Sequence, residues 1–158
     1  MQTFVPDGTS YAASAAVLDR ARLGKQRVEC IQILHALDPH YRSPKTGKPS
    51  SWRNHPAVRM WAGHEGALAR YALACVEEWV RRGYNDIKCG PQLQAYADRF
   101  PDDTPPAWWG NDLVHRSHRS RLIQKKPDHY RPLWPNEADD LDYLWPVPPL
   151  PRHRDARS

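Results

Sequence analysis

The chain has 158 residues, a formal net charge of +5 and a pI near 9.3, which suits one domain with a core of its own. Before Asn136 there are 20 basic and 13 acidic residues, a net +7. Three cysteines without paired spacing argue against a disulfide framework or a zinc ribbon, and no apolar stretch reaches membrane length. We therefore expect a cytoplasmic protein with reduced thiols and a phosphate-bearing partner.

The N-terminal region reads as a short extended arm over residues 1–9, followed by a short helix that Ser10 or Ser14 caps. A first main helix is predicted from residue 19 to residue 38, where Pro39 stops it. The apolar residues that recur there at helical spacing are Leu23, Cys30, Leu34 and Leu37. Cys30, like Cys75 further on, is expected to be a core thiol.

One face of this first helix carries a polar cluster. Arg22, Lys25, Gln26 and Glu29 are three, four and seven residues apart, so they share a side of the helix. Glu29 is the only acid between Asp19 and Asp38, and the neighbouring cations should keep it ionised. Spacing alone favours an ordinary surface ion pair. Arg27 falls inside the apolar stripe, so it needs either a partner or a ligand.

A second main helix is predicted from Pro56 to Arg82, with Asn54 or His55 as its cap and Gly83 beyond its end. It should be the buried centre of the fold, with Trp61 and Trp79 as packing anchors. The loop before it, residues 39–53, is basic and can touch either a nucleic-acid backbone or only solvent.

The stretch between the second and third helices has a weaker pattern. A short helix is expected over residues 92–100. Trp108 and Trp109 stand directly before the Asn111 cap of the third helix, where one ring can stack on a base or both can cover the core.

The third helix repeats His-Arg-Ser over residues 115–120 and is followed by further cations and by Trp134. Its apolar stripe is thin, and the mixture of cations and aromatic rings favours nucleic-acid binding, although a solvated surface helix is the plain alternative. The residues we expect to contact DNA are Arg22, Lys25, Arg27, His115, Arg116, His118, Arg119, Arg121, Lys125 and Tyr130.

The predicted fold is therefore all-α: a single compact domain, residues 1–146, of three main helices joined by long loops. Tyr143, Leu144 and Trp145 form an anchor behind an acidic stretch. Residues 147–158 are rich in proline and arginine and are predicted to be a disordered tail.

Two stretches resemble the pyrimidine-dimer DNA glycosylase family. Residues 81–85, Arg-Arg-Gly-Tyr-Asn, are similar to a Lys-Arg-Gly-Phe-Asn motif that ends the second helix of that family. Arg121-Leu122, the lysines at 125 and 126, Pro127 and Tyr130 are similar to the end of its third helix. Short bacterial proteins share residues 22–29 and 115–120 and look nearer still.

The resemblance implies a base-excision enzyme that uses an N-terminal α-amine and a carboxylate on the first helix. α-Amines titrate near pH 8, so such a group can attack the sugar C1′ and form an imine, after which β-elimination cuts the strand. Here Gln2 follows Met1, so we expect the amine of Met1. The carboxylate of the family falls on Gln26 or near Glu29, and we favour Glu29.

We thus expect a DNA glycosylase, with or without lyase activity, that acts on a damaged base in double-stranded DNA. It should be a monomer, with no cofactor, metal or membrane partner. The main alternative is a non-catalytic nucleic-acid-binding protein on the same scaffold. A third possibility is a metal enzyme that uses His115 and His118 with His55 or His64.

Overall fold

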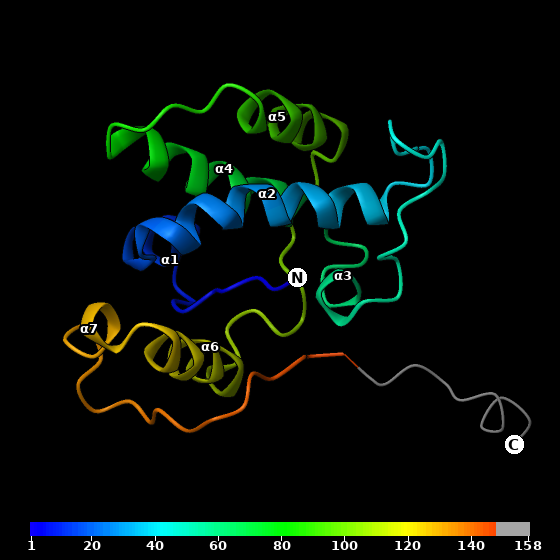
Figure 1. The fold of residues 1–158 in the computed structure, drawn as a ribbon. Helices are drawn as coiled ribbons and strands as arrows, with labels where there is room; N and C mark the ends of the chain where they lie inside the picture. Colours follow the sequence, from blue (N-terminus) through cyan, green and yellow to red (C-terminus); the bar gives the residue numbers. More distant parts are fainter. Residues whose placement is uncertain (148–158) are drawn as a thin grey trace, which may run out of the picture.

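The computed structural model describes residues 1–147, and all regular secondary structure in that range is helical (Figure 1). Its helices are α1 (Tyr11–Val17), α2 (Arg20–Leu37), α3 (Pro56–Arg59), α4 (Glu65–Arg81), α5 (Cys89–Arg99), α6 (Asp112–Lys125) and α7 (Pro127–Tyr130). The all-α prediction is confirmed, but the described part has five substantial helices where three main ones were expected. None of the helices in residues 1–147 has the length and apolar character to cross a bilayer. Of the tail predicted for 147–158, residues 148–158 lie outside the described range.

The predicted second helix is in fact two helices, because the chain turns after α3. His55 caps α3 by accepting a backbone N–H of the first turn on Nδ1 at 3.0 Å, and Pro56 follows it. Gly63 then takes a φ of +81°, which L side chains rarely adopt, and α4 starts two residues later. The end of α4 is as predicted, with Arg81 in the last turn and Gly83 at a φ of +96°.

Helix α4 forms the centre of the packing and lies against α1, α2 and α5 (Figure 1). Trp61 is fully buried beside it, and the Cys30 and Cys75 thiols are free and buried, as predicted. Trp79 is only partly buried. It packs against the core, and its ring also lies 4.3 Å from the guanidinium of Arg27, so Trp79 covers a cation as well.

Four polar side chains of α6, those of His115, Ser117, His118 and Ser120, are buried alongside its few apolar ones. The thin apolar stripe therefore misled the prediction of an exposed face. Ser117 donates to the carbonyl of Val114 at 2.7 Å and accepts the N–H of Leu144 at 3.0 Å. Ser120 accepts the N–H of Leu141 at 3.0 Å. These serines dock the segment after α7 along α6 (Figure 1).

Both tryptophans before α6 pack inward. Trp108 is buried, with its ring 5.1 Å from Trp61 and its indole N–H donating to the carbonyl of Met60 at 2.8 Å. Trp109 is partly buried against Tyr11 at 4.8 Å. Of the two roles considered for this pair, the structure supports a cover over the core.

Candidate active site

The N-terminal arm, residues 1–7, runs between α2 and α6 and ends beside the middle of α2 (Figure 1). Residues 3–6 are buried. Buried backbone N–H and C=O groups must be hydrogen-bonded, and an extended arm has no helical partners of its own. Side chains from α2, α4, α6 and the C-terminal segment supply the partners instead.

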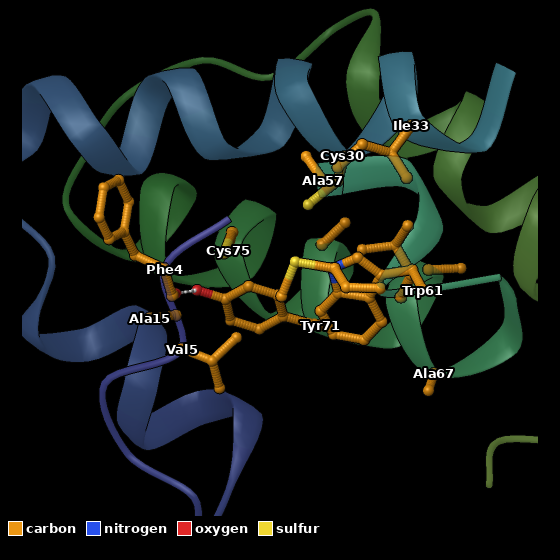
Figure 2. Packing of buried hydrophobic residues seen from close by; sticks show 14 of the residues in the cluster. Phe4, Val5, Ala15, Cys30, Ile33, Ala57, Trp61, Ala67, Tyr71 and Cys75 are labelled. Atoms are coloured by element: carbon orange, nitrogen blue, oxygen red, sulfur yellow. Dashed lines mark hydrogen bonds between the residues drawn. The ribbon is translucent and has the colours of Figure 1, made fainter. Parts of the chain in front are cut away.

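Gln26 holds the arm from the side of α2 and is 1% exposed. Its Oε1 accepts the N–H of Phe4 at 2.8 Å, and its Nε2 donates to the carbonyl of Gln2 at 3.3 Å. From α4, the hydroxyl of Tyr71 donates to the carbonyl of Phe4 (Figure 2). Gln26, predicted among the candidate catalytic residues, is therefore placed beneath the arm as a group that positions it.

Two imidazoles hold the arm from the side of α6. His118 Nδ1 accepts the N–H of Val5 at 2.9 Å. His115 Nε2 accepts the N–H of Gly110 at 2.9 Å, so its Nδ1 carries the proton and donates to the carbonyl of Val5 at 2.7 Å. Burial, with smaller effects of His115 and Arg119, lowers the pKa of His118 to about 3, so its ring is neutral. Both histidines were expected to face DNA, but they are buried and face the arm.

The arm brings Met1 to a pocket of about 320 Å³ on the outer side of α2. Arg22, Lys25 and Glu29 line this pocket from successive turns of α2, and Lys125 lines it from the end of α6. An adjoining pocket of about 400 Å³ shares Met1, Lys25 and Glu29 and extends along α2 toward the loop that precedes α3. An amine, a carboxylate and three cationic side chains thus share one concave site.

The Glu29 carboxyl is half-buried in this pocket. Burial raises its pKa, and the charges of the N-terminal amine, Lys25 and Lys125, with a hydrogen bond from the Gln2 backbone, offset that only in part. The sequence suggested that the neighbouring cations would keep the pKa of Glu29 low. In the structure its pKa is raised, because the effect of burial is larger than that of the cations. A carboxyl with a raised pKa holds a proton at higher pH than an ordinary one, which suits a general acid.

Several residues expected to contact DNA are engaged within the protein instead. Arg27 pairs with Asp86, as its place in the apolar stripe required. Arg116 and Arg119 share the carboxylate of Glu137 at 3.1 and 2.9 Å.

Tyr130, also expected at the DNA surface, is buried, and its hydroxyl donates to the carboxylate of Asp19. Among the cations predicted to contact DNA, three are exposed and make no ion pair within residues 1–147, namely Lys25, Arg121 and Lys125. Two of these three line the Met1 pocket.

The structure does not favour the metal-enzyme alternative. No three His, Cys, Asp or Glu side chains of the described chain come together in a way that could hold an ion. His115 has both ring nitrogens hydrogen-bonded to the backbone, and His118 uses Nδ1 to accept the N–H of Val5.

Two site-related aromatic residues were missed from the sequence. Tyr71 lies inside the apolar pattern of α4, so nothing marked its hydroxyl as an anchor for the arm. Trp52 is 48% exposed and lines the 400 Å³ pocket with Met1 and Glu29. An aromatic residue between serine and arginine in a basic loop was the available signal for it.

These features define a helical protein whose N-terminal amine and a glutamate meet in a basic pocket. A family model described as pyrimidine dimer DNA glycosylase matches residues 1–88, more than half of the chain, so the chain belongs to that family. Membership implies a DNA glycosylase with damaged DNA as its substrate. The matched span contains the arm and α1 to α4, and hence Met1, Arg22, Lys25 and Glu29. Searches of curated proteins and of solved structures gave no match.

Proposed function

We propose that the protein removes a damaged pyrimidine from double-stranded DNA and opens the resulting site through an imine with the α-amine of Met1. The observation that carries this proposal is that Met1 and Glu29 line one pocket together with Arg22, Lys25 and Lys125. A nucleophile, an acid–base group and cations for phosphates are the parts that such a reaction needs. The family to which the chain belongs sets the class of substrate.

In the proposed reaction the lone pair of the amine attacks C1′ of the damaged nucleotide. The bond from C1′ to the base breaks, and the base departs with the bonding electrons and takes a proton. The C1′–O4′ bond then opens, O4′ takes up a proton, and the nitrogen, having lost its protons, becomes an imine with C1′. Removal of a proton from C2′ expels the 3′ phosphate by β-elimination, and water finally releases the protein.

Glu29 is the proton carrier of this scheme. Its raised pKa lets the protonated carboxyl deliver a proton to the departing base or to O4′. The resulting carboxylate stabilises positive charge that develops on the sugar and can accept a proton from C2′. Lys25, Lys125 and Arg22 bind the phosphates on either side of the nucleotide, which holds C1′ near the amine.

A borohydride trap tests the proposal directly. The protein is incubated with a duplex that contains one abasic site, and sodium borohydride reduces any imine to a stable protein–DNA adduct. Trypsin should leave the adduct on the peptide of residues 1–20 if Met1 is the nucleophile. Intact-mass measurement of the same preparation defines its N-terminus.

The adduct must be located on a peptide because Lys125 offers a second amine in the same pocket. Burial, then the charges of Arg22, Arg121 and Lys25, lower the pKa of its amine, and it lines the same pocket. An adduct on the tryptic peptide that begins at Leu122 would move the chemistry to Lys125; this peptide is long, because trypsin does not cleave before Pro127 or Pro132. One glycine added ahead of Met1 should abolish trapping if the α-amine reacts. A wild-type protein that binds the duplex and yields no adduct would overturn the imine mechanism.

A further inference from the structure

A second cavity lies beyond the reacting groups, between the C-terminal half of α2 and the loop that precedes α3. Its volume is about 390 Å³. Gln32 and His35 line it from α2, and Tyr41 and Trp52 line it from the loop, together with several hydroxyl-bearing side chains. The rings of His35 and Tyr41 are stacked at 4.0 Å and 9°, so this wall of the cavity is held in place.

Trp52 connects this cavity to the site of the proposed reaction. It lines both the 390 Å³ cavity and the 400 Å³ pocket that contains Met1 and Glu29, and Gln32 is shared in the same way. The Trp52 ring packs edge-on against His55, with centroids 5.6 Å apart at 72°. It is nevertheless 48% exposed. The ring is thus held on one edge and keeps exposed surface on which a ligand can stack.

We propose that this cavity receives the base of the attacked nucleotide, with Trp52 stacking on it; the inference rests on the proposed function. The base is bonded to C1′, so a C1′ that lies beside Met1 places its base in the neighbouring space. Both volumes fall in the range of small-molecule sites, roughly 300–1,000 Å³. An aromatic face binds a base by stacking, and the Gln32 amide and the hydroxyls offer donors and acceptors to its edge.

The test compares a duplex that carries the damaged bases with one that lacks the base at the position of attack. One carries a thymine dimer, and the other carries a tetrahydrofuran abasic analogue at the same position. Fluorescence anisotropy gives a Kd for each, and the quantity of interest is the ratio of the two affinities. Removing an aromatic that stacks on a base weakens binding by roughly 5- to 150-fold. In Trp52→Ala the preference for the base-bearing duplex should fall by that factor, and in Trp52→Phe it should fall much less.

Arg53→Ala is the matched control, because Arg53 is the exposed neighbour of Trp52 and carries charge without a ring. It should weaken both duplexes equally and keep the ratio of the wild type. An equal loss on both duplexes in Trp52→Ala, or no loss on either, overturns the proposal. The ratio measures binding only. If borohydride traps no imine on the wild type, the amine mechanism is wrong. The ratio of the two affinities still tests whether the cavity binds the base.

Discussion

Helices α2 and α6 carry similar side chains and use them in opposite ways. Both are rich in cations, and both bury polar residues under the N-terminal arm. In α6, Arg116 and Arg119 are neutralised by Glu137, which lies 21 and 18 positions along the chain. In α2, Lys25 stays exposed beside Glu29. A basic helix is thus a candidate binding surface only where no distant acid has already paired with its cations.

The two helices have different roles. Helix α6 is a scaffold, since His115 and His118 hold Val5 from both its N–H and its carbonyl. Helix α2 has two sides with two uses: Gln26 holds the arm on the inner side, and Glu29 faces the pocket on the outer side. Changes on the outer side of α2 should therefore affect chemistry and DNA contacts, whereas changes at the two histidines of α6 should affect stability.

The largest effect is expected on the outer side of α2. Glu29→Gln keeps the shape of the side chain and removes its proton, so single-turnover excision of a thymine dimer should fall by roughly 10²- to 10⁴-fold. Affinity for the same duplex should stay near that of the wild type. Glu77→Gln, an exposed glutamate on α4, is the matched control. Excision by Glu29→Gln at the wild-type rate would make Glu29 a structural residue.

The sequence predicted those features that depend on local spacing. The Ser10 cap of α1, the end of α4 at Gly83 and the sharing of one pocket face by Lys25 and Glu29 all follow from residues a few positions apart. Features set by distant partners could not be predicted. Arg27 finds Asp86 59 positions away, and the α6 imidazoles find the arm more than 100 positions away.

The raised pKa of Glu29 belongs to the second kind, because burial depends on how the whole chain packs. The role of the His-Arg-Ser repeat also depends on residues that are distant in the sequence. A solvated basic face and a buried polar anchor have the same composition, and only the path of the arm distinguishes them. The break at Gly63 was missed for another reason: the apolar spacing of the predicted second helix continues across the turn.

The next largest effect is expected on the inner side of α6. His118→Ala removes the acceptor of the Val5 N–H and the ring that stacks on Tyr143 at 4.3 Å. An orphaned buried donor and a cavity together should lower the free energy of unfolding by roughly 2–4 kcal/mol. Urea unfolding measures this. Arg121→Ala, an exposed cation on the same helix, should change it by less than about 0.5 kcal/mol. Equal effects in the two variants would contradict the scaffold role.

The neutral state of His118 also predicts a pH dependence. Its pKa is about 3 in the folded protein and about 6.5 when unfolded, so between these values the unfolded chain binds the extra proton. The contribution of His118 to the free energy of unfolding has its full value above pH 6.5. It decreases as the pH drops below that, by at most about 1.4 kcal/mol per pH unit. His118→Asn does not titrate there. The stability difference between the wild type and this variant should shrink from pH 6.5 to pH 4, and a constant difference would mean that the ring is already charged.

The smallest effect tests the comparison of the two helices most directly. Each phosphate contact contributes about 0.9 to the slope of log K against log salt concentration. Lys25→Ala should lower that slope by about one unit, which makes affinity about three- to fourfold less sensitive between 50 and 200 mM salt. Arg119→Ala should leave the slope unchanged, because its guanidinium is held by Glu137 and by the carbonyl of Pro6 at 2.8 Å. Circular dichroism must show both variants folded, since Arg119 also supports the arm. A lower slope in Arg119→Ala and an unchanged one in Lys25→Ala would place the DNA on α6, where the charge pattern of the sequence first suggested it.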